Sequence, residues 1–277
     1  NTNREMTSSD LKNGMQALKH LIGNSDCEQN DAELGILFDN CMQLRDLIEN
    51  STLSSIDNEL QEAISTCIKA LEKCTMMVNT LELFSCNETA EELQTASIRY
   101  LLLPAILGSL NLNVQNKNVS DRMTYVEIAE LCKQVFMYEL LTFICDLFAV
   151  VLVYFKDFLR RCSDYELCES SLKYFKEILN KENSNEVNSD PSSVREKKIQ
   201  LFKQKRELEN KEMLLKSAIL RPESEECIRE YYFVLLEKWI LIAVDELENL
   251  KREKEILISM PKKDISTSNI QDKKNVK

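Results

Sequence analysis

Residues 56–83, IDNELQEAISTCIKALEKCTMMVNTLEL, carry the spacing that decides the fold class. Apolar side chains recur there every three or four positions, at Ile56, Leu60, Ile64, Ile68, Leu71 and Val78. That period places them on one face of an α-helix, whereas a half-buried strand would alternate. The stretch therefore predicts a long amphipathic helix, and Ser54 with Asp57 is expected to form its N-terminal cap.

The same helical spacing continues in both directions along the chain. Pro104 is expected to kink the helix that contains it, and Gly108 should either allow a neighbouring helix to approach closely or end the helix. Ser193 and Glu196 have the spacing of a capping box at the start of a later helix. Further helices are expected over residues 31–50, 87–108, 120–161, 165–180, 193–219 and 222–258.

Turn-forming residues are scarce, with only 4 Gly and 4 Pro in 277 residues, which argues against sheets and tight loops. The chain is predicted to be all-α, an elongated antiparallel array of helices that stack as a tetratricopeptide-like α-solenoid or a bundle. Residues 1–30 form an N-terminal extension, 31–258 the helical domain and 259–277 a disordered tail. Within the domain, residues 181–193 (KENSNEVNSDPSS) are the expected linker.

Composition excludes several classes of function. A net charge of −11 argues against nucleic acid as a partner, because phosphate binding needs a basic surface. The single histidine, His20, and the lack of a CxxC pair or a glycine-rich loop argue against a metal, a cofactor and catalysis. The 10 cysteines are expected to be reduced and to pack in a core, which predicts a cytoplasmic protein. The missing catalytic motifs predict that it is not an enzyme.

One apolar stretch offers a different possibility. Residues 135–155 are long enough to span a membrane and contain only Glu139 and Asp146 as charged residues. Each carboxylate would cost on the order of 2.5–3.5 kcal/mol at the centre of a bilayer. A buried helix is therefore preferred, with a membrane-associated helical protein kept as the alternative.

The segment 195–206, REKKIQLFKQKR, reverses the sign of charge in an otherwise acidic chain. Arg195 and Lys198 are three positions apart and so lie side by side on a helix, and Lys205 and Arg206 follow two turns later. Such a row is either a solvated face or a docking edge for an acidic or mixed-charge partner. The stripe expected to be buried on this helix is Ile199, Phe202, Leu208, Leu215 and Ile219.

Several blocks in a fixed order resemble one known family. They are Leu83–Glu88 (LFSCNE), Thr95–Tyr100 (TASIRY), Leu103–Gly108 (LPAILG), Arg195–Glu207, and Glu230–Tyr232 continued by Trp239 and Ile240. Over residues 31–258 they are similar to the alpha-four family, also called the immunoglobulin-binding protein 1 or TAP-forty-two-like family.

The resemblance implies a regulatory adaptor that binds and stabilises the catalytic subunit of type 2A-class Ser/Thr protein phosphatases, in TOR-linked signalling. The phosphatase-contacting cations of that family correspond to Arg195 and Lys198, which would pair with carboxylates of the phosphatase. A helical scaffold or assembly chaperone with another client is the alternative.

The resemblance also raises ubiquitin and a ubiquitin ligase as further partners. A ubiquitin-interacting segment would fall at residues 68–78, where Cys74 and Thr75 replace the expected small alanines and argue against binding. The C-terminal region through which the family recruits a ubiquitin ligase in animals would follow Lys277, so that function is not carried over.

Overall fold

The computed structural model describes residues 8–23, 30–85, 88–115, 147–167, 191–218 and 225–259. All regular structure in these ranges is helical, which confirms the all-α prediction for the described part of the chain. The elements are α1 (Ser8–Gly23), α2 (Asp31–Glu49), α3 (Asn58–Thr80), α4 (Thr95–Ile98), η1 (Arg99–Leu102), α5 (Leu103–Leu112), α7 (Leu147–Asp164), α9 (Pro191–Ala218) and α10 (Glu225–Ser259). The expectations for residues 116–146, 168–190 and 260–277 lie outside the described residues.

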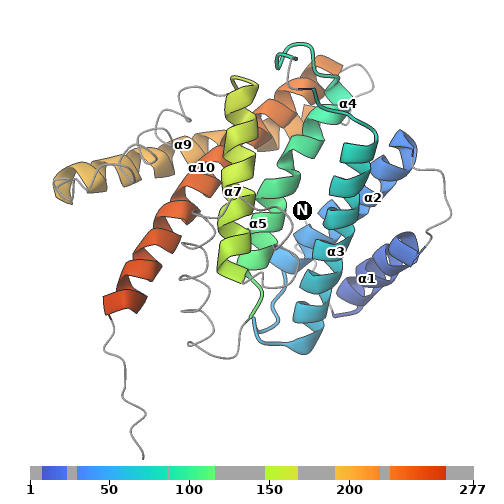
Figure 1. Ribbon diagram of the computed structural model, residues 1–277, viewed down its shortest axis with the longest axis horizontal. Helices are drawn as coiled ribbons and strands as arrows, with labels where there is room; N and C mark the ends of the chain where they lie inside the picture. The colour runs from blue at the N-terminus through green and yellow to red at the C-terminus, as the bar shows by residue number, and fades with distance from the viewer. Residues whose placement is uncertain are drawn as a thin grey trace, which may run out of the picture.

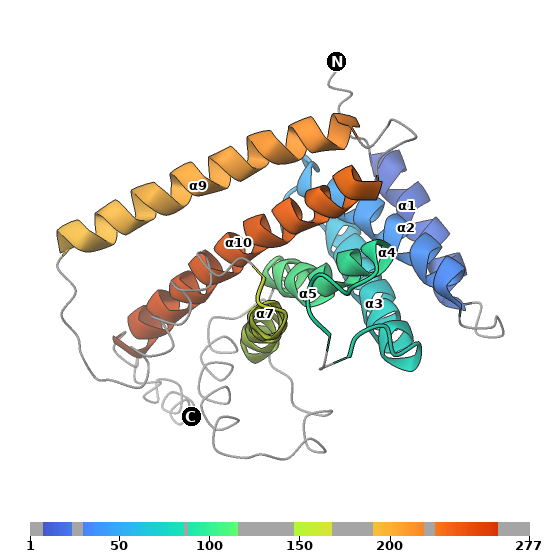
Figure 2. The same cartoon turned by 90° about the horizontal axis from the view of Figure 1, so that it is seen from above.

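The helices from α1 to α7 pack side by side largely in chain order, and α10 returns to pack against them (Figures 1 and 2). Helix α1 lies against α2 and α3, α3 lies against α5, and α5 lies against α7. Helix α10 crosses α7 and the α4–η1 segment, and α9 lies along α10. One continuous apolar core includes residues of every described helix except α9, so these helices form a single stack with α9 on its outside.

Helices α2 and α3 are capped at their N-termini by side chains that accept backbone hydrogen bonds. Asn30 Oδ1 accepts from the Glu33 amide at 2.9 Å, and Asp57 accepts from the Glu59 amide at 2.8 Å. The expected cap at Ser54 is wrong, because the Ser54 carbonyl accepts from the Asp57 amide and closes a turn before α3.

The helix expected to follow Asn87, a residue outside the described ranges, begins only at Thr95. The reason is a long-range contact that the local spacing does not contain. The Arg229 guanidinium donates to the carbonyl oxygens of Ala90 and Leu93, each at 2.7 Å. Because the carbonyls of Ala90 and Leu93 accept from Arg229 of α10, residues 90–93 form turns in place of the first turn of a helix.

Pro104 interrupts the helical segment in the expected place. Proline has no N–H to give to the Tyr100 carbonyl, and the amide of Leu103 takes that carbonyl instead, in a tighter 3₁₀ turn. Residues 95–112 are apolar and long enough to cross a membrane by composition alone. In this structure 72% of that segment is buried inside the stack, as in the core helix of a globular protein.

Other helix ends differ from expectation for local reasons. The helix expected over 165–180 does not begin at Tyr165. Glu166 adopts a left-handed conformation (φ 53°), and the Leu167 amide donates to the Cys162 carbonyl. Together these features end α7. The capping box at Ser193 is also wrong. Helix α9 already begins at Pro191, because proline suits the first helical position.

Gly108 is a point of tight contact between α5 and α7. A Cβ atom on residue 108 would lie 3.0–3.1 Å from ring carbons of Phe155, which is completely buried. The close approach expected at Gly108 is therefore confirmed, whereas the alternative of a helix end at Gly108 is wrong, since α5 continues to Leu112.

We expect Gly108→Val to destabilise the protein by about 1–3 kcal/mol, because the buried Phe155 ring has no room to move away from the added methyl groups. Gly23→Val is the matched control, since no atom lies within 4 Å of a Cβ added there. Its effect should stay within about 0.5 kcal/mol. Thermal unfolding followed by circular dichroism measures both, and equal melting temperatures for the two variants would refute the packing argument.

Candidate partner-binding surface on α9

Helix α9 packs against one described neighbour, the long helix α10. The two run in opposite directions and lie side by side on the outside of the molecule (Figure 2). Ion pairs join them, with Lys211 Nζ 2.9 Å from Glu230 Oε1 and Lys238 in contact with Glu212. The Lys238–Glu212 pair is mostly buried, so it contributes to the register of the two helices.

The face of α9 that meets α10 is a row of half-buried side chains at alternating spacings of four and three. This is the spacing of helices that pack at a shallow angle. Lys205 belongs to this row and lies close enough to Glu246 of α10 to oppose the rise that burial causes in the pKa of that carboxyl. The row consists of Leu201, Lys205, Leu208, Glu212 and Leu215.

A second side of α9 is turned to solvent, and we call it the α9 outer face: Arg195, Lys198, Ile199, Phe202 and Arg206. Lys198 lies at its edge, in line with Lys205, and is exposed because every described side chain of α9 before residue 201 is exposed. Phe202 is 66% exposed and Ile199 is 47% exposed, so the expectation that both are buried is wrong. Nine positions separate Ile199 from Leu208, which is about two and a half helical turns, so the two side chains lie on opposite sides.

Three of the four predicted binding cations, Arg195, Lys198 and Arg206, are thus brought together on the outer face, whereas Lys205 faces α10. Within the described residues no hydrogen bond or ion pair engages the three outer cations. Phe202 lies among them in sequence and on the same side of the helix. The sequence signal for Phe202 is its spacing of seven from Arg195 and four from Arg206, which marks one face.

The composition of the α9 outer face suits a protein partner. Protein interfaces are enriched in aromatic and arginine side chains and concentrate their binding energy there. The arrangement can pair with carboxylates through its cations and fill an apolar pocket of a partner with Phe202.

The described residues offer no candidate metal site. They contain no group of three or more His, Cys, Asp or Glu side chains placed to hold a metal ion. Cys41, Cys67, Cys74 and Cys162 are buried free thiols. Burial raises the pKa of Cys67 to about 12, and a side-chain hydrogen bond with Cys74 raises the pKa of Cys41, so these thiols pack as small apolar groups.

The segment considered for ubiquitin lies in α3. Cys74 is fully buried there, and the Thr75 hydroxyl donates to the Leu71 carbonyl at 3.0 Å. Met76 is exposed, but neighbouring positions alternate between core and solvent in the ordinary way. Nothing in the geometry of α3 supports ubiquitin binding.

Comparison with known proteins places this chain in context. The model of the TAP42-like family matches residues 34–143 and 149–277, a span that includes α9 and α10. Immunoglobulin-binding protein 1 family member C of Homo sapiens is 30% identical over 229 residues, covering 80% of this chain and 60% of that protein. Serine/threonine-protein phosphatase 4 regulatory subunit ppfr-4 of Caenorhabditis elegans is 27% identical over 238 residues, or 85% of this chain and 65% of that protein.

The chain therefore spans less than two thirds of the length of these relatives. A solved structure, described as the structure of the Tap42 alpha4 subunit, superposes with a TM-score of 0.59 at 23% identity. The superposition covers 81% of this chain and 97% of the chain in the solved structure. At that identity the superposition shows a shared helical fold.

We expect Phe202→Ser to leave stability within about 0.5 kcal/mol of the original, because the side chain touches mainly water. Leu208→Ser on the α10-facing row should cost roughly 1–2 kcal/mol, because it removes half-buried apolar surface. Urea unfolding of the two variants measures the difference. A larger loss for Phe202→Ser than for Leu208→Ser would mean that α9 is turned the other way.

Proposed function

The chain belongs to the TAP42-like family, and on that premise we propose that it is a regulatory subunit that binds the catalytic subunit of a type 2A-class Ser/Thr protein phosphatase. Relatives with names of this kind support the proposal. One is the phosphatase 4 regulatory subunit described above, and another is type 2A phosphatase-associated protein 42 of Saccharomyces cerevisiae, 27% identical over 235 residues. In this role the protein supplies a binding surface, and the phosphatase supplies the catalysis.

The observation that carries the proposal is the α9 outer face. It presents three exposed cations around an exposed phenylalanine, in a chain whose net charge is −11. A local reversal of charge on a regular helix orients a partner that carries carboxylates and speeds its correct approach. From Leu201 onward one side of α9 is packed on α10, so Phe202 and Arg206 are held on a rigid support, and Arg195 and Lys198 lie on the exposed end of the same helix.

Binding of this kind explains how an adaptor stabilises a free catalytic subunit without chemistry of its own. A protein that binds only the native state of its partner shifts the partner's folding equilibrium by mass action. At a free adaptor concentration of 100 times Kd the gain is about 2.7 kcal/mol. We further infer, from the family resemblance, that the protein acts in the cytoplasm and in TOR-linked signalling.

Each cation of the predicted set has its own role in the proposal. Arg195 and Lys198 are the primary contacts, and they pair with carboxylates of the phosphatase. Arg206 extends the same face by two turns beyond Lys198. Lys205, which lies beside Glu246 between α9 and α10, contributes by holding α9 at its angle.

We expect the double variant Arg195→Glu/Lys198→Glu to bind the type 2A catalytic subunit on the order of 100-fold more weakly, because two attractions become repulsions at the interface. Calorimetry or surface plasmon resonance with purified proteins measures the affinity. The matched control is Lys216→Glu, another exposed cation near the other end of α9, which should bind like the original chain.

Circular dichroism of the double variant should be unchanged, since neither side chain is buried. If the original chain does not bind the catalytic subunit at all, the proposed function is wrong. If the double variant and the control bind equally well, the function survives and the assignment to α9 does not.

A further inference from the structure

Helices α9 and α10 pack along a seam with the spacing of an antiparallel coiled coil. On α9 the half-buried row from Leu201 to Leu215 has spacings of four and three. On α10 a row with the same spacings consists of Val234, Lys238, Leu241 and Asp245. Val234 and Leu241 are each 4% exposed and lie outside the main apolar core. Between them Lys238 contacts Glu212 of α9, so the two rows face each other across the seam.

Charged residues interrupt the apolar ones at regular places in this seam. On α9 the row alternates leucine with a charged residue, first Lys205 and then Glu212 seven positions later. On α10 Lys238 is followed seven positions later by Asp245, and both are half-buried. The side chains of Glu212 and Lys238, which contact each other, are only 18% and 19% exposed. A charged residue at such a position weakens a coiled coil, and its best-attested use is to select one register.

The charges of the seam oppose a slide of α9 along α10 in either direction. Seven residues make close to two helical turns, so a slide of seven keeps the same rows in the seam. A slide in one direction puts Lys205 in the place of Glu212, against Lys238, where two cations meet. A slide in the other direction puts Glu212 against Asp245, where two carboxylates meet. The pattern of charges therefore acts against both neighbouring registers.

The connection between the helices and the leucines of the seam do not fix the register by themselves. Residues 219–224 join α9 to α10. A slide of seven residues is about 10 Å, whereas six residues of chain can span roughly 20 Å. A slide of seven also exchanges Leu201, Leu208 and Leu215 for one another, so the apolar contacts are similar in each register. The charged residues are the part of the seam that distinguishes the registers.

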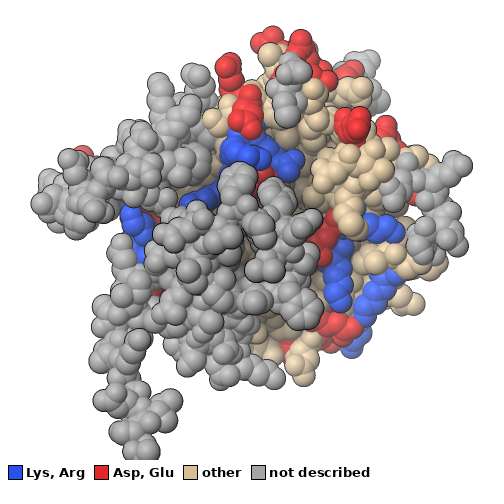
Figure 3. All heavy atoms as spheres, viewed as in Figure 1, with Lys and Arg blue, Asp and Glu red and all other residues tan. Residues whose placement is uncertain are grey.

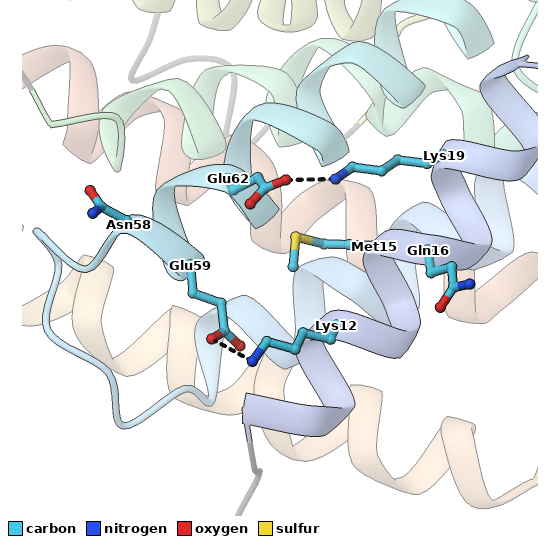
Figure 4. A pocket seen from close by; sticks show the side chains of 7 residues that line it. All are labelled: Lys12, Met15, Gln16, Lys19, Asn58, Glu59 and Glu62. Atoms are coloured by element: carbon cyan, nitrogen blue, oxygen red, sulfur yellow. Dashed lines mark hydrogen bonds and ion pairs between the residues drawn. The ribbon is translucent and has the colours of Figure 1, made fainter.

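An ion pair between α1 and α3 provides a contrast. Lys19 Nζ lies 2.6 Å from Glu62 Oε1 at the rim of an open hollow (Figure 4). The surface view shows cationic side chains next to anionic ones over α1 and α3 (Figure 3). Lys19 and Glu62 are 53% and 57% exposed, and pairs exposed to that degree contribute little. The Lys238–Glu212 pair is shielded from water, so a wrong neighbour is more costly there.

We propose that Glu212 and Lys238 are positioning residues that hold α9 in one register on α10 and so fix the position of the α9 outer face. A slide of seven residues would carry Phe202 about 10 Å along α10. A phosphatase that contacts α9 and α10 together would then meet the outer cations in the wrong place. The role in phosphatase binding rests on the proposed function, whereas the register is independent of it.

The test reverses one charge and reads the register by zero-length carbodiimide cross-linking with mass spectrometry. In the observed register Lys211 Nζ lies 2.9 Å from Glu230 Oε1, and both side chains are about half exposed, so the reagent should join them. The variant is Glu212→Arg in the full chain, because arginine does not react with the reagent. Arg at residue 212 is repelled by Lys238 and attracted by Asp245, seven positions further along α10.

We expect the variant to lose most of the product that joins Lys211 to Glu230. A new product should join Lys211 to Glu237, which a slide of seven residues brings to the place of Glu230. If about one molecule in ten keeps the original register, Kd for the catalytic subunit should rise about tenfold. That loss would occur although the variant gains a cation, which by itself would favour a partner that carries carboxylates.

Two control variants should behave as the original chain does in both measurements. Glu212→Asp keeps the sign of the charge in the seam. Glu62→Arg makes the same reversal at the exposed pair with Lys19, away from α9. Circular dichroism identifies which variants remain folded. If Glu212→Arg unfolds, Glu212→Gln decides, and it should at least halve the Lys211–Glu230 product while the Lys211–Glu237 product appears.

The register is wrong as proposed if the folded variant gives the Lys211–Glu230 product in the original yield. Loss of that product without the Lys211–Glu237 product also overturns it, because the pair would then only hold the helices together. A variant that slides and still binds the catalytic subunit with the original Kd overturns the positioning role. If the original chain does not bind the subunit, the proposed function fails, and the cross-links still decide the register.

Discussion

The length of α10 is the constraint on which the position of α9 depends. Its 35 residues extend roughly 52 Å, whereas α5 and α7, with 10 and 18 residues, extend roughly 15 and 27 Å. The described core helices cover only part of such a rod. Helix α9, with 28 residues, lies along it, and the surface left over on α9 carries the exposed Phe202 and the outer cations. The candidate binding surface therefore follows from the mismatch in helix length.

Helix interiors could be predicted from spacing, but several helix ends could not. The apolar period located α2, α3 and α10 correctly, because in each of them one stripe faces one core. The start of α4 depends on Arg229, a residue more than a hundred positions away, which occupies the carbonyls that an earlier turn would need. The end of α7 depends on a left-handed Glu166, a conformation that glutamate rarely adopts.

The charged residues of the candidate site could be predicted from the sequence, whereas its exposed aromatic residue could not. Arg195, Lys198 and Arg206 are recognisable because a run of cations reverses the sign of an acidic chain. Phe202 was assigned to the core because α9 has apolar residues on two opposite sides, and spacing alone does not say which side α10 will cover. The packing of α1 on α3 could not be predicted from spacing either. Lys73 binds backbone carbonyls there, and a backbone contact leaves no pattern in the sequence.

Hydrogen–deuterium exchange of the full chain, with and without a type 2A catalytic subunit, tests the central claim most directly. The claim is that the helix supported on one side by α10 presents its other side to the phosphatase. The account predicts slower amide exchange in residues 195–206 on binding, with exchange in α2 and α3 unchanged. Slower exchange in α2 and α3 with α9 unaffected would contradict it.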